Sequence, residues 1–319
     1  MLEPDVMLVD ALRSIRLTTR SLRRRPLYAV LTTALLALGI GAATAIIAVL
    51  AATGLRPLPY ADPHRLYALS GVEPQQGAPP AVVPISALQL LRWRTAKRTL
   101  EGVEVVAPIS VKLTGAGEPE PLQGANSSAG LFRLLGVTPI MGRDFRDEEE
   151  APGSGVVIVS HGFWTRRFGR SPAAIGQTLV IDDEPRTIIG VMPEGFTPLL
   201  VNADVFVPLP VGPTLLNLKN FRYLSAVGRL RPEATAAQAK AELDAAGESL
   251  GAELPAIYGR TTTSVVPLDE SLFGAVRPRL IVVSAAVVLL LVIAGANVVS
   301  LSLADALARR SETMTRLAI

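Results

Sequence analysis

Two long stretches without a charged residue constrain this chain more than any other feature. They cover residues 27–55 and residues 280–304. Because a helix rises about 1.5 Å per residue, each stretch can cross a hydrocarbon core of about 30 Å. The first also exceeds the apolar part of a secretion signal, which spans about 7–15 residues, and its small residues Ala43 and Ala45 lie in mid-stretch instead of after it. We therefore predict two membrane-spanning helices, in preference to a cleaved signal or buried core helices.

Arginines indicate which side of the membrane is cytoplasmic, because Lys and Arg beside a span resist translocation. Six of them precede the first stretch and three follow the second: Arg13, Arg16, Arg20, Arg23, Arg24, Arg25, Arg309, Arg310 and Arg316. Both chain ends are thus predicted inside, and residues 56–279 outside, in the periplasm of a bacterial inner-membrane protein. That outer segment holds 22 basic and 23 acidic residues. The net charge of +3 therefore arises at the inner ends and does not indicate nucleic-acid binding.

The segment before the first span, residues 1–26, has a helical pattern of its own. Leu8, Leu12 and Ile15 recur on one face, and the six arginines listed above form the neighbouring face. The pattern predicts an amphipathic helix on the inner membrane surface. Contact with anionic membrane lipid and a specific protein contact both fit this basic face.

The segment between the spans alternates short apolar runs with turn residues. Residues 86–100 and 235–254 predict amphipathic helices, the second beginning with a capping box of Thr235 and Gln238. Strands are predicted within residues 64–71, 102–115, 155–163, 177–196, 204–209, 221–230 and 261–268, and the fourth of these ranges reads as a hairpin. Two ranges rich in Pro and Gly, 72–84 and 207–213, are expected loops. The order predicts a split α/β sandwich with a β-rich insertion between its halves.

The sequence lacks the residue patterns that catalysis or metal binding requires. It has no cysteine, and its two histidines, His64 and His161, have no ligand spacing around them. The acidic groups at residues 147–150 and 182–184 fall in predicted loops, where solvated charges are expected. We therefore predict that the chain is not an enzyme and binds no cofactor or metal.

Small residues in the first span suggest a packing role. GIGAAT, residues 39–44, superficially resembles a phosphate loop, but a phosphate cradle needs a strand, a loop and a helix start in water. Gly39, Gly41, Ala42 and Ala45 instead offer a flat strip for a neighbouring helix. No GxxxxGK[ST] motif occurs, so any ATP on which the protein depends is expected on another chain.

Six segments, taken in order, resemble a known family. They read ALGIGAATAII, LRPLPYADPHRL, LLGVTPIMGRDF, VVIVSHGFWTRRFG, IGVMPEGF and IAGANVVSLSLADALARRSETMTRLAI. The chain resembles the permease subunits of MacB/FtsX-type ABC transporters, and most of all the large, often internally duplicated MacB-like permeases. The resemblance implies an α+β membrane protein. Two transmembrane helices, residues 27–55 and 280–304, would flank a periplasmic core domain, residues 56–279, with a porter-like α/β part and a β-rich insertion.

The resemblance also implies a function. In this family an ABC ATPase subunit hydrolyses ATP and moves the periplasmic domains, for export or envelope work. The alternative is a non-transporting, membrane-anchored module that acts on a lipoprotein, a peptide or a cell-wall hydrolase. A cytoplasmic coupling segment is expected at residues 305–319, with ATPase-facing residues Arg309, Arg310, Glu312, Arg316, Leu317 and Ala318. Relatives continue with at least two further spans, so a second permease copy or a C-terminal half is an expected partner.

Overall fold

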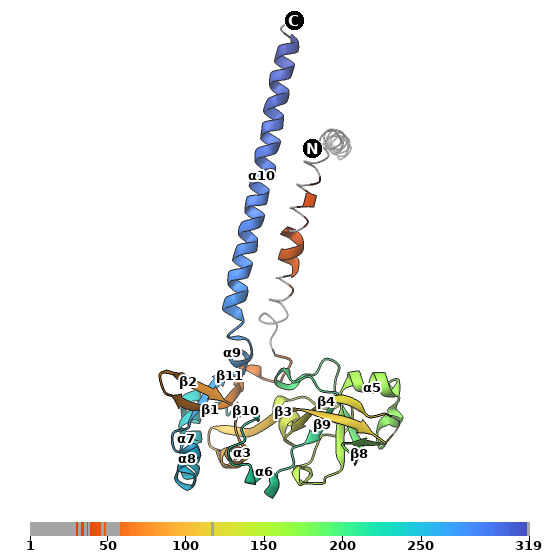
Figure 1. Cartoon of the computed structure of the whole chain (residues 1–319), viewed down its shortest axis with the longest axis vertical. Coiled ribbons are helices and arrows are strands. Elements are labelled where there is room, and N and C mark those ends of the chain that lie inside the picture. Colours follow the sequence, from red (N-terminus) through yellow and green to blue (C-terminus); the bar gives the residue numbers. More distant parts are fainter. Residues whose placement is uncertain are drawn as a thin grey trace. The chain divides into compact units, whose positions relative to one another are not determined.

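The computed structural model describes residues 58–115 and 118–317, and within the first uncharged stretch residues 30, 33–34, 37, 39–45 and 48. The chain divides into two units. Pro57–Gly274 forms one, which we call the central domain, and Met1–Arg56 with Ala275–Ile319 forms the other. Figure 1 shows the sheet of the central domain and, in the second unit, the long helix α10 (Arg277–Leu317).

One half of the central domain, which we call the α/β half, repeats a strand–helix–strand unit twice. Its elements are β1 (Leu66–Gln75), α3 (Ala87–Trp93), β3 (Leu100–Thr114), β10 (Ser225–Leu230), α7 (Ala236–Glu253) and β11 (Thr262–Pro267). The strands lie in the order β11-β1-β10-β3, and all neighbours are antiparallel. This is the ferredoxin-like arrangement, which confirms the predicted split α/β sandwich.

The second half, which we call the inserted half, lies in the chain between β3 and β10. Its strands and helices are β4 (Glu120–Ser127), α4 (Leu131–Leu135), β5 (Met141–Gly142), β6 (Val156–Val159), α5 (His161–Phe168), β7 (Thr178–Ile181), β8 (Glu184–Val191), β9 (Val205–Pro208) and α6 (Pro213–Asn217). The sheet continues in the order β3-β4-β9-β6-β8-β5, with β7 paired to β3 and β8. Strand β3 pairs with β10 near its start and with β7 at its end, so one long strand runs through both halves. The β-rich insertion is confirmed.

Local sequence signals explain several element boundaries. The side chain of Thr235 accepts a hydrogen bond from the Gln238 amide and starts α7, as the capping box predicts. Ser86 and Gln89 form the same box at the start of α3. In the β7–β8 hairpin the turn residues Asp182 and Asp183 have φ values of 50° and 66°. Two such residues match the right-handed twist of the flanking strands, so the predicted hairpin is confirmed.

Two expectations for the central domain are wrong, and some of its elements were not predicted. The expected loop 72–84 instead forms a hairpin, because β1 extends to Gln75 and β2 (Ala78–Val83) pairs with it. Helix α3 ends at Trp93 instead of residue 100, because Leu100 pairs with Leu230 at the start of β3. Strand β6 lies within the predicted range 155–163, but helix α5, which Ser160 caps, was not predicted. Strand β4 was not predicted either.

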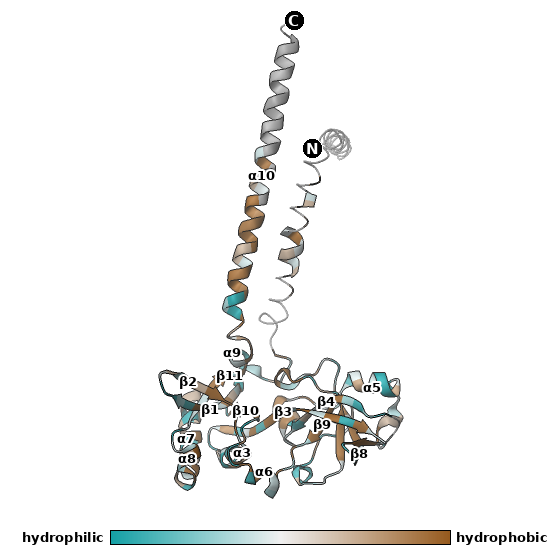
Figure 2. Cartoon of the chain, in the orientation of Figure 1, coloured by the Kyte–Doolittle hydropathy of each residue, from teal (hydrophilic) through white to brown (hydrophobic). Residues whose placement is uncertain are grey.

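Three apolar clusters fill the central domain. One lies under α3 and α7 in the α/β half, around Trp93 and Leu243. Another lies between α5 and the inserted strands, around Phe163 and Trp164. The third, which we call the junction cluster, surrounds Phe132 and takes residues from both halves. Figure 2 shows brown, apolar segments along the strands of the sheet, where these clusters form.

The second unit contains described parts of both uncharged stretches. Residue Gly39 lies close to Leu291 of α10, since a Cβ added at Gly39 would be 2.6 Å from the Leu291 Cδ2 atom. A Cβ at Gly41 would meet nothing within 4 Å. Among the residues that the structure describes, no helix meets the combined length and apolar character that crossing a membrane requires. The two spans, like the packing role of residues 39–45, stay predictions from the sequence.

Candidate functional site at the domain junction

Polar side chains that could suggest chemistry are engaged in structural contacts. Among the described residues, no group of three or more His, Asp or Glu is placed to hold a metal ion. The imidazole of His161 packs edge-on against Trp164, with 5.6 Å between ring centroids. In the 3₁₀ turn Asp147–Glu150, Glu149 pairs with Arg143, and Asp182 accepts a hydrogen bond from the Lys112 amide. These contacts explain the acidic groups as parts of the fold.

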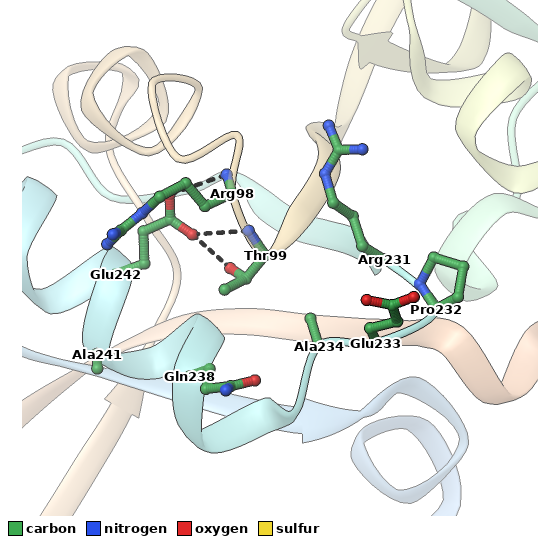
Figure 3. Close-up of a pocket in the computed structure, with 9 residues that line it drawn as sticks. All are labelled: Arg98, Thr99, Arg231, Pro232, Glu233, Ala234, Gln238, Ala241 and Glu242. Carbon is green, nitrogen blue, oxygen red and sulfur yellow. Dashed lines mark hydrogen bonds and ion pairs between the residues drawn. The ribbon is translucent and has the colours of Figure 1, made fainter.

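A cavity of about 670 Å³ lies between the start of β3 and the start of α7 (Figure 3). In this cavity, the carboxylate of Glu242 accepts hydrogen bonds from the amides of Arg98 and Thr99 and from the Thr99 hydroxyl. Burial alone raises the pKa of Glu242, but these hydrogen bonds outweigh it and lower the pKa below its usual value. A carboxylate held this way is a poor general base. It ties α7 to β3.

The chain enters the central domain through residues 58–65, which we call the entry segment. Tyr60 is buried, and its hydroxyl donates to the Thr197 carbonyl and accepts from the Leu199 amide, both at 3.2 Å. The Ala61 amide donates to the Leu135 carbonyl at 3.0 Å. Burial raises the pKa of Tyr60, so its hydroxyl stays protonated and able to donate. The entry segment is therefore fixed to the inserted half.

Arg229 fixes the same segment to the α/β half. This arginine lies on β10, and its side chain is only 8% exposed. Its guanidinium donates to the carbonyls of Leu134 (2.8 and 3.0 Å), Ala61 (2.6 Å) and Asp62 (3.2 Å). Arg65 adds a hydrogen bond to the Leu230 carbonyl at 2.8 Å and an ion pair with Glu101. Two backbone segments, helix α4 and the entry segment, thus converge on a single buried guanidinium.

The chain leaves the central domain through helix α9 (Leu268–Phe273), which follows β11 directly. Leu268 is 1% exposed and belongs to the junction cluster, together with Tyr60 and Leu66. Leu58 and Leu272 pack against the same cluster. The α9 helix also contacts β1 and the 3₁₀ turn η2 (Pro63–Arg65) of the entry segment. The entry and the exit of the central domain therefore share one core.

An ion-pair network joins the two halves at a second point. Arg94, the residue after α3, donates to both carboxylate oxygens of Glu150 (2.6 and 2.8 Å) and to Glu104 (3.1 Å). Glu150 also accepts from the Ala129 amide at 2.8 Å. Burial raises the pKa of Glu104, against the influence of Ser128 and Arg94. The bidentate pairing sets the orientation of the halves as well as holding them together.

The junction brings together segments that the sequence analysis quoted only because they resemble those of a known family. A cavity of about 400 Å³ is lined by Pro59, residues 136–140 and residues 193–196, which belong to three of the six quoted segments. Tyr60 and Arg229 were missed as functional residues. The sequence held a signal for Arg229, because it is the one charged residue in AVGRL, residues 226–230, within a predicted strand.

The predicted site residues at the chain ends are not among the residues that form this junction. The backbone of α10 includes five of the expected coupling positions, Arg309, Arg310, Glu312, Arg316 and Leu317. Ala318 lies outside the described residues, as do the predicted membrane-surface residues Arg13, Arg16, Arg20, Arg23, Arg24 and Arg25. The described residues include Gly39, Gly41, Ala42 and Ala45. Their proposed roles remain predictions.

Comparison with known proteins identifies one family. A family model described as the MacB-like periplasmic core domain matches residues 29–246. Among solved structures, the extracellular domain of the noncanonic ABC-type transporter YknZ from Gram-positive bacteria is similar at 17% identity, with a TM-score of 0.45, over 62% of this chain and 99% of that one. The periplasmic region of MacB from Actinobacillus actinomycetemcomitans is similar at 13% identity and a TM-score of 0.46, over 63% and 89%. Among curated proteins, no sequence matches the chain.

Proposed function

Because this chain belongs to the MacB-like periplasmic core domain family, which is found in ABC-type permeases, we propose that it couples ATP hydrolysis by a partner ABC ATPase to movement of its central domain. The observation that carries the proposal is the junction. Both connections to the central domain enter one cluster, and buried hydrogen bonds fix the first of them to both halves. Covalent chemistry has no part in this role.

The proposed topology places the central domain outside the cytoplasm. Residues 27–55 and 280–304 would span the bacterial inner membrane, and the arginines beyond them would keep residues 1–26 and 305–319 inside. The chain has no cysteine, so a single introduced thiol is free of background. In intact cells, Asn220→Cys should react with a membrane-impermeant maleimide and Ser14→Cys should react only after lysis. The opposite labelling pattern would overturn the topology and the transporter proposal with it.

A rigid junction is what such coupling requires. If the entry segment were only a tether, displacing the first span would change the path of a loop and leave the domain in place. The hydrogen bonds of Tyr60, Arg65 and Arg229 oppose that outcome, because the entry segment cannot shift without breaking several of them. The network of Arg94 and Glu150 then holds the inserted half to the α/β half. Movement of either connection should turn the domain as a body.

The cytoplasmic contact is proposed at the end of α10, at Arg309, Arg310, Glu312, Arg316, Leu317 and Ala318. Exposed ion pairs contribute about 0–1 kcal/mol each, so a stable interface with the ATPase needs further surface from a second permease copy or a C-terminal half. Glu312→Lys and Arg316→Glu should weaken ATPase capture in the assembled permease without reducing membrane insertion. Glu248→Lys, a charge reversal on the exposed side of α7, serves as the control. Equal capture by all three variants would refute this placement.

A further inference from the structure

Two exposed apolar side chains lie beside the entry segment of the central domain. Ile140 is 49% exposed and Leu200 is 55% exposed. Ile140 lines the 400 Å³ cavity together with Pro59 of the entry segment. Leu200 follows the Thr197 and Leu199 backbone groups that the Tyr60 hydroxyl holds. Leu200 is therefore linked to the entry segment through Tyr60, and Ile140 shares a cavity with it.

The backbone around Leu200 is unusual. Leu199 and Leu200 have φ values of 49° and 64°, a conformation that side chains other than glycine rarely adopt. Strained positions persist where surrounding contacts hold them, and such positions concentrate at functional sites. Here the Leu199 amide is held by the Tyr60 hydroxyl. The consequence of the turn is that a leucine is presented to solvent.

The entry segment limits how far these side chains can be from the membrane. Tyr60 comes five residues after Leu55, where the first uncharged stretch ends. At about 3.3–3.6 Å per residue, even a fully extended chain places Tyr60 within about 18 Å of that end. The headgroup region on each side of the hydrocarbon core occupies several of those ångströms. Through the Tyr60 hydroxyl, the turn at Leu200 is tied to a residue that lies within this reach of the predicted span.

From these observations we infer that the central domain docks on the outer leaflet of the lipid bilayer, with Ile140 and Leu200 inserted at the interface. The inference rests on the proposed two-span topology. The contact is apolar, because the cavity beside Ile140 is also lined by the exposed carboxylate of Glu194, which anionic lipid would repel. Docking should therefore depend little on salt. Such docking would hold the central domain in one resting orientation between cycles of ATP hydrolysis.

Leu218 provides a matched control. It is 50% exposed and directly follows α6, which Figure 1 places on the opposite side of the central domain from α9. If exposure alone drove lipid contact, Leu218 would behave like Leu200. If the entry segment determines the contact, only Ile140 and Leu200 should meet lipid.

The test uses nitroxide labels on single cysteines in the full chain, reconstituted into vesicles of phosphatidylethanolamine and phosphatidylglycerol at about 3:1. Ile140→Cys, Leu200→Cys and Leu218→Cys are compared by electron paramagnetic resonance, using collisions with oxygen, which enters lipid, and with a water-soluble nickel chelate. We expect oxygen to dominate at 140 and 200, the nickel chelate to dominate at 218, and no change between about 0.1 and 1 M NaCl. Unchanged thermal midpoints exclude misfolding.

Three results would overturn the docking. The nickel chelate could reach the labels at 140 and 200 as readily as the label at 218. High salt could move the labels at 140 and 200 out of the lipid. Both reagents could be excluded from these positions, which would indicate a second copy of the chain on this face. A fourth label, Ala37→Cys in the first uncharged stretch, separates this failure from failure of the topology. Oxygen dominating at 37 but not at 140 and 200 would refute docking alone. The nickel chelate dominating at 37 would refute the spans, and docking with them.

Discussion

Replacing Arg229 with methionine tests whether the junction is held by this guanidinium. Methionine keeps the apolar stem of the side chain and removes the charge, so the variant buries no unpaired cation. It also removes every hydrogen bond that the guanidinium makes to the carbonyls of Leu134, Ala61 and Asp62. Burial already lowers the pKa of Arg229, a sign that its charge has been taken out of water.

The expected loss of stability follows from the acceptors that remain. Hydrogen bonds to a charged group contribute about 1.5–3 kcal/mol each, but Ala61 and Asp62 are exposed and water can replace the arginine there. The partly buried Leu134 carbonyl loses both of its bonds from Arg229. We therefore expect a loss of about 2–4 kcal/mol in the free energy of unfolding. For a domain of this length that corresponds to a midpoint lower by about 4–16 °C.

The assay can follow the central domain alone within the full chain. The chain's two tryptophans, Trp93 and Trp164, are both buried in the central domain, in different apolar clusters. Thermal unfolding in detergent, followed by tryptophan emission, therefore reports on both halves. Arg231→Met is the matched control, since Arg231 is exposed and its side chain donates a hydrogen bond to the Lys97 carbonyl. Its midpoint should move by no more than about 2 °C. Equal shifts in the two variants would show that Arg229 does not hold the junction.

Three further predictions concern other parts of the chain. Burial raises the pKa of Asp144 to about 6, above its usual value of 3.8. Ionising this carboxyl group therefore lowers the stability of the folded domain. The loss is absent below pH 3.8 and grows as the pH rises toward 6. In unfolding scans, Asp144→Asn should therefore stabilise the domain most above pH 6 and least near pH 4, whereas Asp147→Asn, at an exposed residue, should show no such trend. Gly39→Ile should lower the thermal stability of the second unit by circular dichroism, because its side chain meets Leu291, and Gly41→Ile should not. The purified chain should show no saturable ATP binding in equilibrium dialysis, because it has no phosphate loop.

Elements with strong local signals could be predicted from the sequence. Helix α7 begins at its capping box and keeps Ala239, Leu243 and Leu250 buried on one face. The β7–β8 hairpin has an Asp-Asp turn between apolar strands. The order of such elements was enough to predict the split α/β half, because a ferredoxin-like arrangement follows from two strand–helix–strand units in one sheet.

Elements whose residues favour no regular structure could not be predicted. Strand β2 reads APPAVV and β4 reads EPLQGANS, and both contain Pro or Gly, which are uncommon in strands. Each forms because a long neighbour supplies hydrogen bonds: β2 pairs with the end of β1, and β4 lies between β3 and β9. Tertiary pairing here outweighs local preference. The same holds for Leu100. The sequence predicted it in a helix, but it pairs with Leu230 as part of strand β3.

The junction depends on contacts that no window of sequence contains. Arg229 bonds to Ala61 across 168 residues, and Tyr60 bonds to Leu199 across 139. What the sequence did contain was a set of segments without chemical motifs, three of which line one cavity at this junction. These segments carry no catalytic or metal-ligand motif, so chemistry gives little reason for their residues to be specified. Holding both chain connections to the central domain does require particular residues in these segments. Each segment must keep a backbone carbonyl, a turn or an apolar side chain at a fixed position. We propose force coupling, and not catalysis, as the role that accounts for such segments.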